Sequence, residues 1–132
     1  MIARNLDEVF EKLDFTDSII IDIKWENNLI DLVLNIDYYW DIQEGHKETR
    51  ILKVTFKCCI KADFHMTPNL IEMTDAEIQS YILSWYTIVA FRKSYIDCND
   101  MVCIQVLTTD FTVPWLTVLC KGIQVEEINK ST

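Results

Sequence analysis

The tightest grouping of residue types that perform acid–base or metal chemistry in this sequence is Asp63 with His65. Residues two apart in a strand point to the same side, so the carboxylate and the imidazole would lie about 7 Å apart at the end of a predicted strand. We interpret them as a polar pair at a strand end rather than as a general base or a metal site. The other histidine, His46, lies in a predicted loop with no partner in sequence, which is typical of a solvated side chain.

Motifs of the common enzyme classes are missing from the sequence. It has no GxSxG elbow and no HExxH pair, and its two glycines are too few for a phosphate cradle of backbone amides. The five cysteines include no CxxC pair, and we interpret them as reduced and packed like small apolar residues. We therefore predict a protein that is not an enzyme and that holds neither a metal nor a cofactor.

The element that positions most of the remaining polar side chains is a predicted β-hairpin over residues 18–40. Asn tolerates positive φ, so Asn27-Asn28 is expected at the two central positions of a tight turn. This turn would pair Ile19 with Ile36, Ile21 with Leu34, Ile23 with Leu32 and Trp25 with Ile30 on one apolar face. The opposite face, including Ile20 and Asp22, is expected in solvent, with Lys24 facing Asp31.

Two short helices are predicted from capping patterns. Asn5 is a good N-cap with Glu8 as its capping-box partner, and Thr74 with Glu77 repeats the pattern in the middle of the chain. The residues that repeat at helical spacing in the first helix, and that are expected to face the sheet, are Leu6, Val9, Phe10 and Leu13.

Further strands are predicted over residues 51–64, 101–109 and 113–126, where Gly122 is expected to introduce a bulge that re-aims Ile123 and Val125. Alternation in the first of these strands puts lysines on its polar side, beside Asp31 and Asp37 if it pairs antiparallel with the hairpin; its register stays open. After Trp40, the sequence to Arg50 reads as a loop. Between residues 76 and 90 helix and strand patterns both fit, and we favour a strand over about residues 83–95.

These elements predict a single domain over residues 1–132 of the mainly β (α+β) class. We expect about six strands in a curved antiparallel sheet or a small β-sandwich, with an N-terminal helix and a short middle helix.

The net charge of −9 is concentrated in residues 1–44, which hold eleven acids against three bases. Such a field repels nucleic acid and anionic lipid and attracts basic surfaces. No apolar run approaches the roughly 20 residues that cross a bilayer, and the N-terminus lacks a hydrophobic signal core, so a cytoplasmic protein is expected.

The outer face of the hairpin is therefore the predicted contact surface for a basic protein partner. Acids there would meet cationic side chains, and an exposed tyrosine would supply buried area. The predicted binding residues are Asp22, Glu26, Asp31, Asp37, Tyr39 and Asp41.

Several of these segments resemble small acidic bacterial proteins known as immunity proteins of polymorphic toxin systems, and related domains of unknown function. The similar segments are Phe15-Thr16-Asp17-Ser18, Asp37-Tyr38-Tyr39-Trp40, Pro114-Trp115-Leu116, Cys120 and Val125-Glu126-Glu127. The resemblance implies a cytoplasmic antidote that blocks a toxin domain by steric occlusion and charge complementarity, without catalysis. It assigns no binding residue.

Two other functions remain open from the sequence. One is a structural or homo-oligomerising domain, such as a homodimer, that uses an exposed sheet edge. The other is a small-ligand binder with a pocket lined by Trp85, Tyr86, Phe91 and Trp115.

Overall fold

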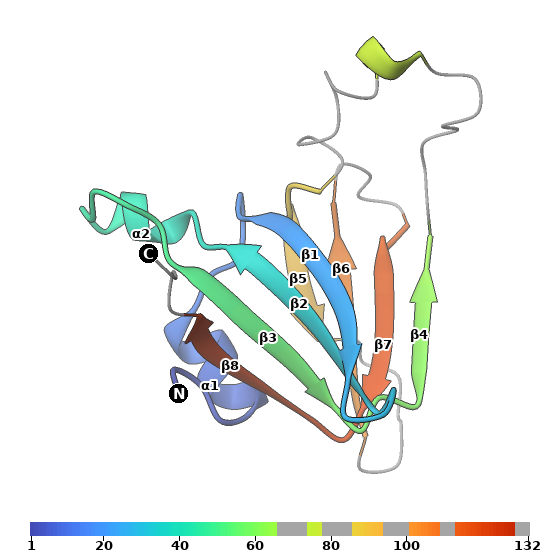
Figure 1. Cartoon of the computed structure of the whole chain (residues 1–132). Helices are drawn as coiled ribbons and strands as arrows, with labels where there is room; N and C mark the ends of the chain where they lie inside the picture. Colours follow the sequence, from blue (N-terminus) through green and yellow to red (C-terminus); the bar gives the residue numbers. More distant parts are fainter. Residues whose placement is uncertain (66–73, 78–85, 94–100, 109–112, 129–132) are drawn as a thin grey trace.

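The computed structural model describes residues 1–65, 74–77, 86–93, 101–108 and 113–128, and these are mainly β, as predicted. Two four-stranded antiparallel sheets and short helices make up the described part (Figure 1). The elements are α1 (Leu6–Lys12), β1 (Ile19–Glu26), β2 (Asp31–Asp37), α2 (Trp40–Gln43), β3 (Ile51–Lys57), β4 (Lys61–Phe64), β5 (Ala90–Lys93), β6 (Val102–Leu107), β7 (Leu116–Cys120) and β8 (Gly122–Ile128). No helix in these ranges is long and apolar enough to cross a membrane.

The two sheets are joined by two bent strands. The orders are β1-β2-β3-β8 and β4-β7-β6-β5, so the β3/β8 pair of one sheet continues as the β4/β7 pair of the other. Hydrogen bonds from Lys121 N to Lys57 O and from Ile60 N to Leu119 O carry the pairing across the bend. The predicted strand over residues 51–64 is thus broken at Cys58, whose φ of 51° turns the chain. Strands that change sheets through such bends are a known way of making the corner of a β-sandwich.

The predicted irregularity at Gly122 is found at the second bend. Buried positions are even-numbered before it, as at Val118 and Cys120, and odd-numbered after it, at Ile123 and Val125. The chain therefore keeps one side toward the core in both sheets. The change lies between two strands, β7 and β8, rather than within the single strand that was predicted.

The hydrophobic core lies between the two sheets. Two sets of contacts, one at the start of β1 and one at the edge of β8, cover its sides. Ile20 N donates to Tyr86 O and Ile88 N to Ser18 O, which ties the start of β1 to the segment leading into β5. The N-terminus covers the outer edge of β8 through the Ala3–Val125 bridge, and α1 packs against β8. The largest fully buried side chains include Tyr38, Phe56, Leu34, Ile104 and Ile123.

The hairpin forms, but the predicted turn and register are wrong. Four residues, 27–30, connect the strands, with φ of 54° at Asn27, 57° at Asn28 and 69° at Leu29. Ile23 consequently faces Leu34 and Trp25 faces Leu32, two positions from the predicted partners. A shift of two keeps the alternation, so Ile23 and Trp25 remain on the predicted face of the sheet.

A bulge at Ile21 alters the start of β1. The register shifts between Ile20 and Asp22, which buries Ile20 to 6% exposure and leaves Ile21 53% exposed. The prediction that Ile20 points to solvent is therefore wrong, whereas Asp22 is exposed as predicted.

Both capping patterns are present. The Asn5 carboxamide oxygen accepts from Glu8 N at 3.0 Å, and the Glu8 carboxylate accepts from Arg4 N rather than from the N-cap itself. Thr74 Oγ1 accepts from Glu77 N at 3.2 Å, and residues 75–77 are helical.

Two predictions after β2 turn out differently. The segment after Trp40 begins with the short helix α2 instead of a loop. The strand favoured over residues 83–95 falls partly outside the described residues, and the part that is described contains β5.

Candidate functional site

Three of the six predicted contact residues lie together on the outer face of the hairpin. Asp22 faces Asn35 and accepts a hydrogen bond from its side chain at 3.3 Å, and Glu26 faces Asp31. β2 pairs antiparallel with β3, which brings two lysines to the same face. Lys53 contacts Glu26 at 2.8 Å, and Lys57 contacts Asp31 at 3.0 Å.

Asp31 is part of the fold rather than of the accessible surface. It is 4% exposed, and its carboxylate also accepts from Cys58 N at 3.0 Å. The backbone hydrogen bond from Cys58, aided by Lys57, lowers the pKa of Asp31 although burial opposes this. The acid therefore holds the bend between β3 and β4 against the hairpin.

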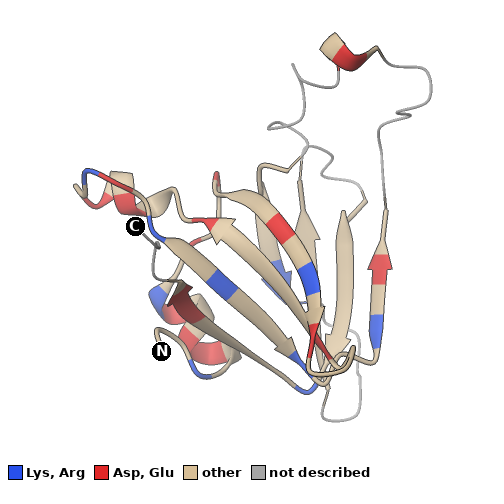
Figure 2. Ribbon diagram, in the orientation of Figure 1, with Lys and Arg blue, Asp and Glu red and all other residues tan. Residues whose placement is uncertain are grey.

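Glu26 forms an ion pair that crosses the middle strand. Its contact with Lys53 runs from β1 to β3, and the register places Val33 of β2 beneath it. Val33 is fully buried although it lies on the outer face. The hydrogen bond from Lys53 lowers the pKa of Glu26. This face, predicted to be acidic, carries Lys24, Lys53 and Lys57 beside Asp22, Glu26, Asp31, Asp37 and Glu126, so lysines offset much of its negative charge (Figure 2).

Asp41, at the other end of the hairpin, is 1% exposed and is held by Arg50. Both carboxylate oxygens accept from Arg50, at 2.8 Å from Nη2, 3.0 Å from Nε and 2.8 Å from the backbone N. Burial opposes ionisation of Asp41, but the hydrogen bonds from Arg50 outweigh it and lower the pKa of Asp41. The guanidinium also lies 5.7 Å from the centre of the Tyr38 ring. Asp41 therefore stabilises the turn from α2 into β3.

Asp37 and Tyr39 lie near Asp41 and far from Glu26. Asp37 is half-buried, and one of its carboxylate oxygens is buried without a hydrogen-bond partner. Tyr39 is 38% exposed, and its hydroxyl accepts from Gln43 at 3.3 Å. Residues 31 and 37 are separated by the length of β2, about 20 Å. Glu26 with Asp31, and Asp37 with Tyr39 and Asp41, thus lie at opposite ends of the hairpin, and Asp22, opposite Asn35, lies between them.

Asp41, Glu44 and His46 place one potential metal-ligand atom each within 4.8 Å of one another. The oxygens of Asp41 are already occupied by Arg50, and Glu44 and His46 are exposed. This arrangement is explained by the ion pair, and we assign no metal to it.

The other sequence candidates for chemistry are also accounted for. Asp63 contacts Lys61 at 3.3 Å, consistent with a polar group on an exposed strand. The rings proposed for a ligand pocket are divided between two clusters. Trp115 contacts Phe64 and Tyr86, whereas Phe91 contacts Phe10, Phe15 and Phe56. Trp85 lies outside the described residues.

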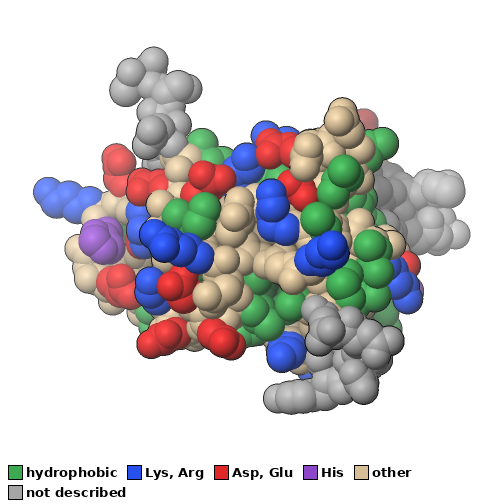
Figure 3. Space-filling model, turned by 90° about the horizontal axis from the view of Figure 1, so that it is seen from below, with side chains coloured by type: hydrophobic (Ala, Val, Ile, Leu, Met, Phe, Trp, Pro, Cys, Tyr) green, Lys and Arg blue, Asp and Glu red, His purple; other side chains and the backbone are tan. Residues whose placement is uncertain are grey.

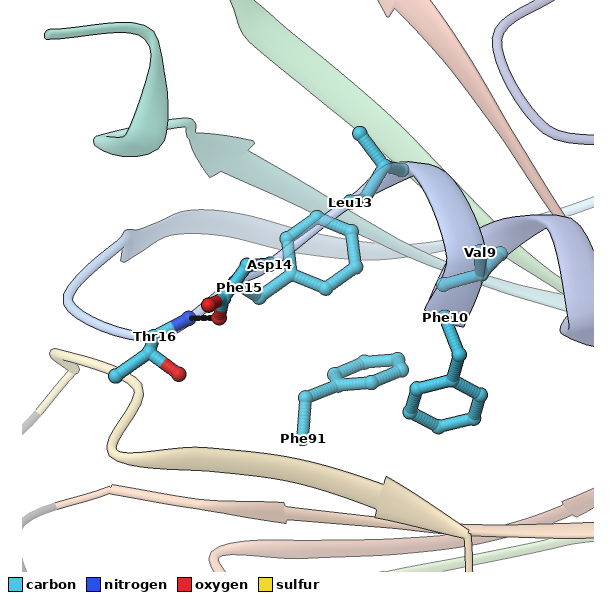
Figure 4. Close-up of a pocket in the computed structure, with 7 residues that line it drawn as sticks. All are labelled: Val9, Phe10, Leu13, Asp14, Phe15, Thr16 and Phe91. Atoms are coloured by element: carbon cyan, nitrogen blue, oxygen red, sulfur yellow. Dashed lines mark hydrogen bonds between the residues drawn. The ribbon is translucent and has the colours of Figure 1, made fainter. Parts of the chain in front are cut away.

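A pocket that sequence reasoning missed lies between α1, the loop after it and β5 (Figure 4). Its volume is about 270 Å³, and it is lined by Val9, Phe10, Leu13, Asp14, Phe15, Thr16 and Phe91. The centre of the Phe91 ring is 4.9 Å from that of Phe15 and 6.1 Å from that of Phe10. Phe10, predicted to face the sheet, is 44% exposed, because α1 instead buries Val9. Its exposure is the feature that opens an aromatic surface here.

Asp14 is the charged group of this pocket. The backbone fixes its position, because Asp14 N donates to the Tyr38 hydroxyl at 3.0 Å and its carboxylate accepts from Thr16 N at 2.9 Å. Figure 4 shows the carboxylate and Thr16 at one end of the pocket, with the rings of Phe10 and Phe91 at the other.

The segment around the pocket carries a local cluster of unpaired negative charge. Residues 4–17 hold five acids and two bases. Glu8 pairs with Lys12 at 3.9 Å. The remaining acids, which form no ion pair with any residue in the described ranges, are Asp7, Glu11, Asp14 and Asp17. The charge excess was visible in the sequence, but its position beside Phe91 was not.

Comparison of the sequence with models of known protein families gives no match, and neither does comparison with curated proteins.

Proposed function

We propose that this chain is a non-catalytic protein-binding domain that captures a basic partner through the pocket between α1 and β5. The observation that carries the proposal is the combination of three phenylalanine rings with the Asp14 carboxylate in one cavity. Aromatic faces attract a cation within about 6 Å, and a carboxylate adds a charge-assisted hydrogen bond. The expected anchor is therefore an arginine or lysine side chain of the partner.

The size of the pocket favours a side chain over a free ligand. At about 270 Å³ the cavity lies just below the range of roughly 300–1,000 Å³ typical of small-molecule sites. The methylene stem of an arginine or lysine would pack on Leu13 and Phe10, and its charged group would reach Asp14. The unpaired acids Asp7, Glu11 and Asp17 would attract other cations of the same partner and increase the association rate.

The partner class comes from the resemblance to immunity proteins. We propose that the partner is a cytoplasmic toxin domain with a basic surface and that binding blocks this surface. A toxin-like reading frame next to the gene for this chain would support this class, and an isolated gene would count against it. Asp22, Glu26, Asp37 and Tyr39 remain accessible enough to add secondary contacts, whereas Asp31 and Asp41 do not.

The direct test is a titration with two short peptides that differ only at a central Arg or Glu, followed by NMR of the aromatic side chains. We expect weak, salt-sensitive binding of the Arg peptide that perturbs Phe10 and Phe91. Asp14→Asn should weaken it about fivefold, equivalent to loss of roughly 1 kcal/mol.

Asp7→Asn is the matched control, because it removes the same charge from α1 without touching the pocket. If the two substitutions weaken binding of the Arg peptide equally, Asp14 acts through net charge alone and the pocket is not the binding site. Equal binding of the Arg and Glu peptides, or perturbation away from Phe10 and Phe91, would refute the proposal.

A further inference from the structure

Within the described residues, one edge of the first sheet is paired along only part of its length. β1 is the outermost strand, and its start is paired through Ser18 and Ile20 with residues 86–88. From Asp22 to Glu26, no described residue forms a backbone hydrogen bond on the outer side of the strand. An open edge of this kind is a template for a further strand.

The side chains on this edge are apolar on one face and charged on the other. Ile21, Ile23 and Trp25 are 53%, 37% and 40% exposed. Asp22 and Lys24 alternate with them on the outer face. A lysine normally discourages edge pairing. Here Lys24 contacts Glu26 of the same strand at 3.4 Å, and Asp22 lies two residues away on its other side, so the strand carries both signs of charge.

We infer that a second copy of this chain adds to β1 in antiparallel pairing about a two-fold axis at Ile23. In this register Ile23 faces Ile23 of the second copy, and Asp22 faces Lys24 of the second copy, twice by symmetry. The contact is self-complementary in both charge and apolar character, as a two-fold interface requires.

Charge also excludes the neighbouring register. An axis at Lys24 would place Lys24 against itself and Asp22 against Glu26 of the second copy. Directly opposed like charges are unfavourable on adjacent strands. Glu26 keeps its contact with Lys53 in the inferred register, because that ion pair runs toward β3 and away from the open edge.

The dimer joins the two first sheets into one continuous sheet. Other exposed apolar groups lie beside the end of this edge, where Cys59 N donates to Ile30 O. Leu29, Ile30 and Ile60 are 73%, 45% and 67% exposed, and Figure 3 shows hydrophobic side chains between charged ones at this end of the molecule. None of residues 21–25 lines the pocket at α1, so dimerisation and partner binding can be tested separately.

The test is sedimentation equilibrium of the full chain over a range of concentrations, with circular dichroism to confirm folding. The unsubstituted chain should show a concentration-dependent monomer–dimer equilibrium. Lys24→Asp and Asp22→Lys should each weaken the dimer about tenfold, since each turns two attractive contacts into repulsive ones. The double variant Asp22→Lys/Lys24→Asp restores both attractions and should recover the dimer.

Lys121→Asp, an equal charge change at an exposed bend, is the control and should leave the dimer unchanged. A chain that stays monomeric at all concentrations would overturn the inference. So would a dimer that is indifferent to Lys24→Asp, and a dimer strengthened by Asp22→Lys would show that the axis lies at Lys24 instead.

Discussion

The ion pair between Asp41 and Arg50 allows a sharp prediction, because its two members differ in exposure. The Asp41 side chain is 1% exposed and that of Arg50 is 36% exposed. When Asp41 is replaced by Asn, the remaining guanidinium can turn toward water. When Arg50 is replaced by Gln, the remaining carboxylate stays buried without its cation. The second change should therefore be the more destabilising.

The magnitudes follow from the contacts. Asp41→Asn removes the charge from the hydrogen bonds of both oxygens, each worth roughly 1.5–3 kcal/mol when charged, and Asn retains one acceptor. We expect a loss of about 2 kcal/mol in the free energy of unfolding. Arg50→Gln should lower it by about 3–5 kcal/mol, the usual effect of stranding a buried charge. Both losses fall below the total stability of most domains, roughly 5–15 kcal/mol, so the Asn variant should still fold.

Urea unfolding followed by circular dichroism measures both changes. A loss of about 2 kcal/mol moves the midpoint by about 1 M if the slope is about 2 kcal/mol per M. Asp63→Asn, the same substitution at an exposed site on β4, is the control and should change stability by less than about 0.5 kcal/mol. If Asp41→Asn matches this control, or if it destabilises more than Arg50→Gln, the reasoning from exposure is refuted.

Three further outcomes are expected. The pKa values of Asp31 and Asp41 are lowered in the fold, so the contribution of these carboxylates to the free energy of unfolding is complete above the ordinary pKa of about 3.9 and is lost as pH falls through the lowered values. Acid unfolding should therefore steepen below about pH 4, and it should do so less in Asp41→Asn. Leu29→Gly should stabilise the chain by about 1 kcal/mol in thermal unfolding, since a leucine at φ 69° is strained, and a loss of stability would contradict this. Burial raises the pKa of Cys120 to about 12, so iodoacetamide should label it only after unfolding, as mass spectrometry of labelled peptides would show.

The sequence was sufficient for the hairpin strands, the helix caps and the fold class because these depend on local patterns. The cap formed by Asn5 and Glu8 and the alternation in β3 depend only on residues that are close together in the sequence. The register of the hairpin failed for a physical reason. A two-residue turn at Asn27-Asn28 predicts the wrong register because Leu29 also adopts a left-handed conformation, and the longer turn moves the partners of Ile23 and Trp25 by two positions.

The candidate site was less predictable because it depends on contacts between distant residues. That Lys57 would neutralise part of the acidic face was foreseeable once β2 and β3 were expected to pair, but Arg50 lies in a stretch that was read as a loop. The pocket needs Phe91 against Phe10, a contact between a helix and a strand far apart in sequence. The exposure of Phe10, which is visible only in the structure, is the feature that reveals the pocket.

The structure divides the acids of the N-terminal third into two groups with different roles. Residues 1–44 carry an excess of eight acids over bases. Three of these acids, Glu26, Asp31 and Asp41, are balanced by cations from later in the chain and hold the strands together. Another three units of the excess lie within residues 4–17, whose acids form no ion pair with a cation from elsewhere in the part of the chain that the structure describes. Charge that the fold does not neutralise is available to the basic partner proposed above, and four such acids, Asp7, Glu11, Asp14 and Asp17, lie on or next to α1 beside the aromatic pocket.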